Sequence, residues 1–177
     1  MARTIWLYGL AAGGLVVASI AIGIMLGTDG GAGGMMIGYL IMLVALSLIF
    51  IAIKRHRDHV QGGVIRFTTA FGIGLGISIV ASATYVAGWE VYLWSTGYTF
   101  IEDYAMATLK AQVADGASSA DIAALRASLE DMKTLYANPM TRMGVTFIEI
   151  LPVGMLVSLV SAALLRNSGF LPVRHVA

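Results

Sequence analysis

Residues 144–165 constrain this chain more than any other stretch, because their only ionisable side chain is Glu149. A helix rises by ~1.5 Å per residue, so a run of this length crosses a hydrocarbon core of ~30 Å. Arg142 precedes the run, Arg166 follows it, and Pro152 lies inside it, where membrane helices tolerate proline. The run therefore predicts a membrane-spanning helix. A carboxylate at that depth is costly, so Glu149 needs a partner or a function.

The composition excludes most other classes of protein. Hydrophobic residues make up 58% of the chain and charged residues 12%, whereas soluble domains are ~25% charged. A soluble chain of 177 residues could not bury so much apolar surface. The net charge of +1 provides no basic face for nucleic acid, and the lack of cysteine excludes disulfides and thiolate metal sites. We therefore expect the lipid bilayer as a partner, and no nucleic acid, cofactor or metal.

Three further apolar runs are long enough to cross a bilayer, at about residues 5–25, 35–53 and 71–94. The first run exceeds the ~7–15 residues of a signal-peptide core, so we interpret it as a retained span. With residues 144–165, the chain therefore has four predicted spans.

The polar region between the last two spans, residues 99–141, has the pattern of two helices. Gly116 suits the end of the first helix, and Ser118 with Asp121 resembles the capping box of the second. Apolar residues then recur at helical spacing up to Asn138 and Pro139. These features predict an all-α fold in one domain, residues 1–177: a four-span transmembrane helical bundle with an extramembrane helical hairpin between spans 3 and 4.

The basic residues favour one side of the membrane. We interpret residues 54–59 as a short basic loop after the second span. His56, His59 and Asp58 could form a metal site there, but such loops more often set orientation and contact anionic lipid headgroups. Seven basic residues share one side of the four-span topology: Arg3, Lys54, Arg55, Arg57, Arg66, Arg166 and Arg174. The positive-inside rule therefore predicts that both termini are cytoplasmic.

Small residues mark the faces on which two spans should pack. The third span carries a stripe of them: Gly72, Gly76, Ala83 and Ala87. This stripe leads to Glu90, which we therefore expect on the packed side of the helix. In the last span, Gly154 and Ser158 lie opposite Glu149. Both faces of that helix then need covering, which favours a second subunit.

Glu90 and Glu149 are expected at a similar depth in the same leaflet. If their helices touch, the two carboxylates can share a proton, which suits a proton- or cation-coupled process. Alternatively, each acid is satisfied by neighbouring Ser, Thr or Tyr hydroxyls or by Arg142, which lies on about the same face as Glu149. The candidate functional residues are therefore Glu149, Glu90, Arg142 and Pro152.

Two blocks of residues carry a resemblance to a known family. The first block comprises Gly62, Gly63, Phe67, Ala70, Phe71 and Gly74. The second comprises Asn138, Pro139, Phe147, Glu149, Gly154 and the small-residue run 158–163. With these blocks the chain resembles small bacterial inner-membrane proteins grouped as domain of unknown function 4199. The resemblance implies a four-span protein of the bacterial inner membrane and brings no established activity.

The leading functional hypothesis is a non-catalytic integral membrane protein. It would act as an accessory, scaffold or assembly subunit of a membrane complex, with a protein partner or as a homo-oligomer. The alternative is a small oligomeric proton- or cation-coupled transporter or channel that uses Glu149 and Glu90. An enzyme is least favoured, because the sequence contains no serine–histidine pair, metal motif or dinucleotide fingerprint.

Overall fold

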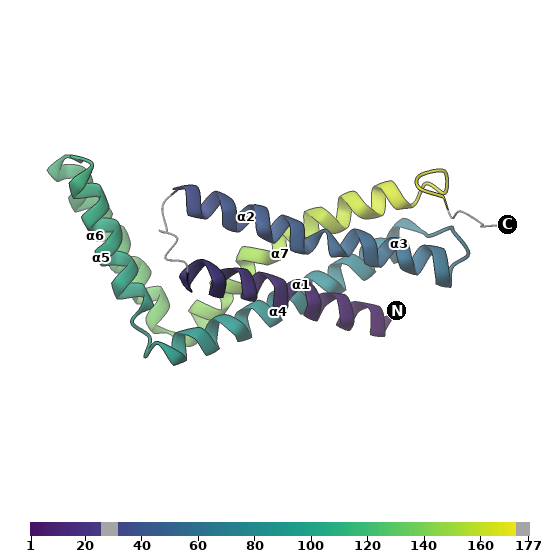
Figure 1. The fold of residues 1–177 in the computed structure, drawn as a ribbon, viewed down its shortest axis with the longest axis horizontal. Helices are drawn as coiled ribbons and strands as arrows, with labels where there is room; N and C mark the ends of the chain where they lie inside the picture. Colours follow the sequence, from purple (N-terminus) through teal and green to yellow (C-terminus); the bar gives the residue numbers. More distant parts are fainter. Residues whose placement is uncertain (26–31, 173–177) are drawn as a thin grey trace.

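The computed structural model describes residues 1–25 and 32–172, and this part of the chain is helical and contains no strand (Figure 1). The helices follow in chain order: α1 (Ala2–Met25), α2 (Ala32–Leu46), α3 (Leu48–Val60), α4 (Phe67–Ser95), α5 (Phe100–Ala114), α6 (Ser119–Ala137) and α7 (Pro139–Leu165). Among the described residues, four helical segments are long and apolar enough to cross a membrane: Ala2–Gly23, Met36–Val60, Phe67–Ser95 and Pro139–Leu165. The prediction of an all-α fold with four membrane-spanning helices is confirmed.

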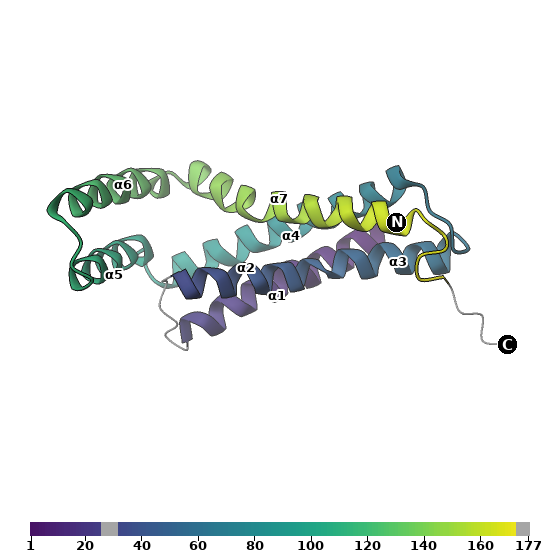
Figure 2. The same ribbon diagram turned by 90° about the horizontal axis from the view of Figure 1, so that it is seen from above.

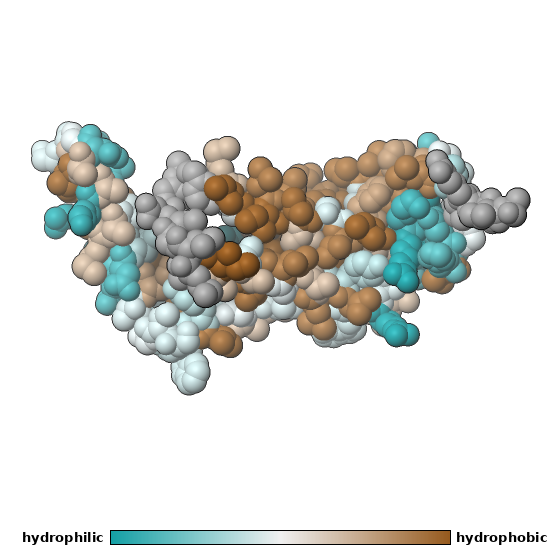
Figure 3. Space-filling view, viewed as in Figure 1, coloured by the Kyte–Doolittle hydropathy of each residue, from teal (hydrophilic) through white to brown (hydrophobic). Residues whose placement is uncertain are grey.

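The central helix of the bundle is α4, which packs along both α1 and α7 (Figures 1 and 2). The spans lie side by side in alternating directions, so the N-terminus and the C-terminal end of α7 share one end of the bundle. The core between the spans is rich in fully buried isoleucines: Ile49, Ile53, Ile73, Ile77 and Ile150. On the face drawn in Figure 3, apolar side chains also gather in the middle and hydrophilic ones toward the ends. Such a surface suits a hydrocarbon environment between two polar boundaries.

The second span consists of two helices, α2 and α3, divided at Ser47. The Ser47 hydroxyl donates to the Val44 carbonyl at 2.6 Å. Its N–H is shared between the Leu43 and Val44 carbonyls, at 2.9 and 3.2 Å. Serine that bonds back to the preceding turn bends helices, which explains the break.

The prediction of a short loop at residues 54–59 is wrong, because α3 continues through this segment to Val60. Arg57 lies within it and is fully buried. Its guanidinium donates to the main-chain carbonyls of Phe170 at 2.9 Å and Leu171 at 2.6 Å, and to the Asp58 carboxylate at 2.7 Å. Because these acceptors satisfy its donors, Arg57 can be buried in the core. The α3 helix can therefore continue through the charged residues 54–59. The predicted contribution of Arg174 to the membrane orientation concerns a residue outside the described part of the chain.

The polar region folds as α5 and α6, which contact each other and extend beyond the end of the bundle opposite the N-terminus (Figures 1 and 2). The Ser118 hydroxyl accepts a hydrogen bond from the Asp121 N–H at 3.2 Å, which caps the start of α6. Only Ala105 on α5 and Leu129 on α6 are buried. The position of this pair outside the membrane stays a prediction.

Candidate functional site

Small residues face one another where the antiparallel helices α4 and α7 cross. Gly74 faces Ser158 and Ser78 faces Gly154, and the two serine hydroxyls lie 3.2 Å apart. A Cβ atom added to either glycine would lie 2.6 Å from the facing serine oxygen. Glycine therefore allows the two backbones to approach, as small residues do in membrane helix pairs. This close approach brings the neighbouring side chains of α4 and α7 within reach of one another.

Toward the end of the crossing near α5 and α6, Arg142 on α7 holds Glu90 on α4. The guanidinium Nε and Nη2 atoms donate to the two carboxylate oxygens at 2.7 and 2.6 Å, which is the strong two-bond geometry of an arginine–carboxylate pair. Nη1 donates to the Tyr136 main-chain carbonyl at 2.8 Å. The Tyr98 ring lies 5.2 Å from the guanidinium carbon, within cation–π range. Arg142 is buried. Through these bonds it connects α7 to both α4 and α6.

Tyr136, which supplies that carbonyl from the end of α6, also has a perturbed phenol. Burial raises the pKa of the Tyr136 hydroxyl above its ordinary value, and the nearby Glu149 carboxylate adds to the shift. Ionisation of this phenol is therefore less favourable than that of an exposed tyrosine.

Glu149 has a different environment from Glu90. Its carboxylate accepts one hydrogen bond, from the Tyr85 hydroxyl on α4 at 3.3 Å. The Glu149 side chain is exposed on the surface of the bundle, whereas Glu90 is largely covered. Each acid thus has its own partner on the opposite helix, which is the arrangement of the second alternative above. Arg142 bonds Glu90 rather than Glu149, although it shares a helix with Glu149.

The stripe of small residues on α4 is divided between several environments. A Cβ atom at Gly76 would lie 2.9 Å from the Ile5 side chain on α1, and one at Gly72 would meet only the Met1 side chain, at 3.9 Å. Ala83 and Ala87 are exposed on the surface of the described chain. Among the four residues of the stripe, Gly76 is the one that lies at a close contact between two helices, α4 and α1.

On α7, Gly154 and Ser158 are buried against α4, while Pro152 is exposed like Glu149. Proline has no N–H to donate to the carbonyl four residues earlier, at Ile148. The α7 helix is bent in both views, as expected for a helix with an internal proline (Figures 1 and 2).

Three contacts of the structure were not predicted from the sequence. Tyr85 gave no signal, because a tyrosine in an apolar run usually indicates core packing. Gly74 opposite Ser158 has the spacing of a small-residue motif, with Ser78 one turn later, and a search for such motifs could have found it. Arg57 stands in a run of charges, where no local pattern distinguishes a buried arginine from its exposed neighbours.

A metal site near residues 54–59 was considered from the sequence. Within residues 1–25 and 32–172, no three His, Cys, Asp or Glu residues are placed to hold a metal ion. Asp58 instead bonds Arg57 and Lys54.

Comparison with known protein families gives a match. A family model described as "Protein of unknown function (DUF4199)" matches residues 7–167. The chain belongs to this family. The matched region contains all of α2 to α7 and most of α1. The contacts of Arg142 with Glu90, of Tyr85 with Glu149 and of the facing glycines and serines therefore lie within it. Comparisons with curated proteins and with solved structures found no match. The family description assigns no activity, so a function has to be argued from the geometry.

Proposed function

We propose that this protein is a non-catalytic subunit of a membrane complex, in an accessory, scaffold or assembly role, and that another protein covers the Glu149 face of α7. The observation that supports this is the exposed Glu149 side chain in the middle of a candidate membrane span. Placing an acid against lipid at that depth costs ~2.5–3.5 kcal/mol on insertion scales. A partner helix that donates hydrogen bonds or carries a positive charge would remove much of this cost.

The surroundings of Glu149 fit a helix-binding surface. It stands in a stripe of exposed apolar residues on one face of α7: Val145, Ile148, Pro152 and Leu156. The opposite face of α7 is already occupied by α4 through Gly154 and Ser158. A helix lying along this stripe would therefore add to the bundle without displacing any contact in it.

A photoreactive phenylalanine derivative at Ile148 tests this proposal in intact cells, with Leu40 on α2 as the control because both positions are exposed and apolar. We expect a protein adduct of defined mass from position 148, and only lipid adducts from position 40. Adding Glu149→Leu should reduce the adduct from position 148. An adduct with a second copy of this chain would identify a homo-oligomer. Lipid adducts alone at both positions would contradict the proposal.

A proton- or cation-coupled transporter or channel is the second candidate, favoured by the same exposed carboxylate if several copies surround a pore. Glu90 contributes less to this alternative, because it is already paired with Arg142. Under it, the purified protein alone should carry flux across liposomes, and Glu149→Gln should abolish the flux without changing assembly. Under the accessory-subunit proposal the purified protein carries none.

We further propose that the protein resides in a bacterial inner membrane with both termini in the cytoplasm. The end of the bundle that contains the N-terminus also holds most of the basic residues near the span ends: Arg3, Lys54, Arg55, Arg57, Arg66 and Arg166. Because the chain has no cysteine, a single introduced thiol reports its side unambiguously. In intact cells, an impermeant thiol reagent should label Ala123→Cys and not Gln61→Cys. Labelling of position 61 alone would reverse the orientation.

A further inference from the structure

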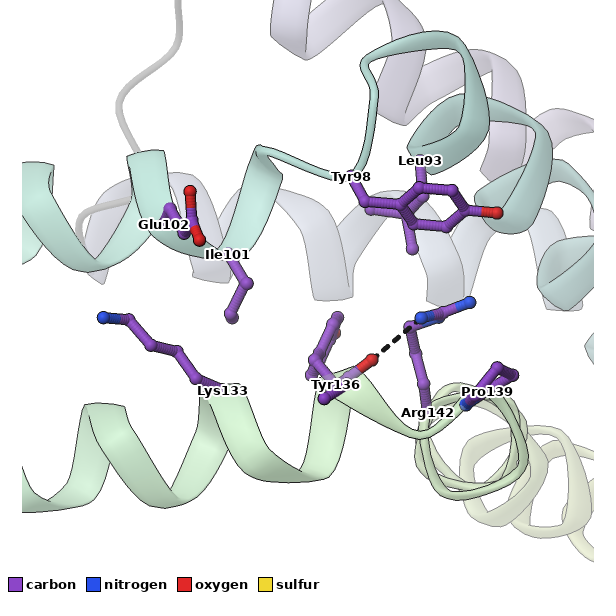
Figure 4. A pocket seen from close by; sticks show the side chains of 9 residues that line it. Leu93, Tyr98, Ile101, Glu102, Lys133, Tyr136, Pro139 and Arg142 are labelled. Carbon is purple, nitrogen blue, oxygen red and sulfur yellow. Dashed lines mark hydrogen bonds between the residues drawn. The ribbon is translucent and has the colours of Figure 1, made fainter.

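A cavity of about 490 Å³ lies where the bundle meets α5 and α6 (Figure 4). Its walls come from the end of α4, the start of α5, the end of α6 and the start of α7, and they include Glu102, Lys133, Tyr136 and Arg142. Two of the candidate membrane spans, Phe67–Ser95 and Pro139–Leu165, have their ends here. The cavity therefore lies at the level where a bilayer would place its polar headgroups.

Arg142, which is paired with Glu90, gives the cavity a wall with unused hydrogen-bond donors. A guanidinium has five N–H groups. Arg142 uses three of them, two on Glu90 and one on the Tyr136 carbonyl. The remaining two can donate to an anionic oxygen without loss of the Glu90 pair. Because Arg142 is already fixed in place, a ligand that meets it does not have to order a mobile side chain.

Lys133 and Glu102 provide a second pair of charges at the other side of the cavity, and their side chains face the same gap from α6 and α5 (Figure 4). Lys133 bonds Glu130 at 2.9 Å in a pair that is largely exposed, and such pairs are weak enough to exchange for another anion. The cavity thus combines positive groups that suit a phosphate with a carboxylate that suits an ammonium group.

We propose that this cavity binds the headgroup of a phospholipid that carries a primary amine, with the phosphate at Arg142, the ammonium group at Glu102, and the Lys133 side chain turned from Glu130 toward the phosphate. A headgroup with a phosphate and an ammonium group fits a cavity that has both cationic and carboxylate side chains better than a purely anionic headgroup does. The acyl chains would follow the apolar surface of α4 and α7. This site is separate from the Glu149 face, and it stands whether or not a partner protein binds there.

Lipid retention by the purified full-length protein tests the site. The protein is incubated in detergent with equal amounts of phosphatidylethanolamine and phosphatidylglycerol, and bound lipid is counted by native mass spectrometry. Lys133→Ala is compared with Lys110→Ala, and Glu102→Gln with Asp103→Asn, because each control removes the same charge from an exposed position outside the cavity.

We expect one phosphatidylethanolamine per chain in the original protein. Lys133→Ala should weaken the binding of both lipids by about tenfold, which is the scale of one charge-assisted hydrogen bond. Glu102→Gln should weaken the binding of phosphatidylethanolamine and leave that of phosphatidylglycerol unchanged. The two control variants should bind both lipids like the original protein. Lipid retention that is equal in all variants would overturn the proposal. So would a preference for phosphatidylglycerol in the original protein, or displacement of all lipid by millimolar inorganic phosphate, which would indicate a site for soluble phosphate.

Discussion

Arg142 and Arg57 are both buried, and they lie at opposite ends of the bundle. Arg142 is neutralised mainly by a carboxylate on another helix, through two bonds to Glu90. Arg57 instead donates mainly to main-chain carbonyls at and beyond the end of α7, and its one carboxylate partner is the adjacent Asp58. Main-chain carbonyl oxygens are hydrogen-bond acceptors, so Phe170 and Leu171 can receive the guanidinium without an acid from a distant part of the chain. The Leu165 carbonyl adds the partial negative charge of the C-terminus of α7.

The difference determines what each arginine stabilises. The Arg142 pair connects two spans, so its removal affects the packing of α4 against α7. The Arg57 bonds connect α3 to the segment that follows α7, so their removal should affect that end alone. Four sets of substitutions test this distinction, from the largest expected effect to the smallest.

Arg142→Ala should be the most damaging substitution, because it leaves Glu90 partly buried without a counter-ion. We expect a loss of about 3 kcal/mol in the free energy of unfolding, measured in bicelles. The double variant Arg142→Met with Glu90→Leu should recover most of this loss, since it removes the unpaired charge. A single-variant loss below about 1 kcal/mol would place this pair among weak surface ion pairs.

Arg57→Ala should cost about 2 kcal/mol, because it leaves buried carbonyl oxygens without donors. Hydrogen exchange should increase in residues 166–172 and stay unchanged where α7 meets Glu90. The exposed neighbour provides the control: Arg55→Ala should leave both stability and exchange unchanged. Faster exchange along the whole of α7 would show that the two ends are not independent.

Removing only the negative charge should separate the two ends further. Glu90→Gln should cost about 2 kcal/mol, because Arg142 loses its main counter-charge. Asp58→Asn should cost less than about 1 kcal/mol, since the carbonyls beyond α7 still accept from Arg57. Equal losses, measured by the same unfolding assay, would show that Asp58 rather than the carbonyls neutralises Arg57.

Gly154→Ala tests the crossing that lies between the two ends. The new methyl group would lie 2.6 Å from the Ser78 oxygen, and overpacking of this kind costs about 1–3 kcal/mol. Alanine recovers about 0.5–1 kcal/mol through its better helix propensity, so the net loss should be about 1 kcal/mol. Gly144→Ala on the same helix meets nothing within 4 Å and should be neutral or slightly stabilising. Similar free energies of unfolding for the two variants would mean that α4 and α7 can move apart at the crossing without loss of stability.

The membrane spans and the helical region between them could be predicted because their signals are local. The apolar run around Glu149 and the capping pattern at Ser118 need no knowledge of other segments. The site was predicted only as a set of residues: Glu90, Glu149 and Arg142 were selected, and two pairings of the acids were left open. Which one forms depends on how α4 and α7 are rotated against each other, and the Gly74–Ser158 and Ser78–Gly154 contacts set that rotation.

Sequence alone determined that this chain enters a membrane and that buried charges within it need partners, because hydrophobicity and helix length act residue by residue. Only the tertiary structure decided the partners. Arg57 bonds carbonyls more than 100 positions further along the chain, and Glu149 faces outward while Glu90 is enclosed. These outcomes depend on helix rotation and register, which arise from contacts between distant segments, so no pattern within a single helix encodes them.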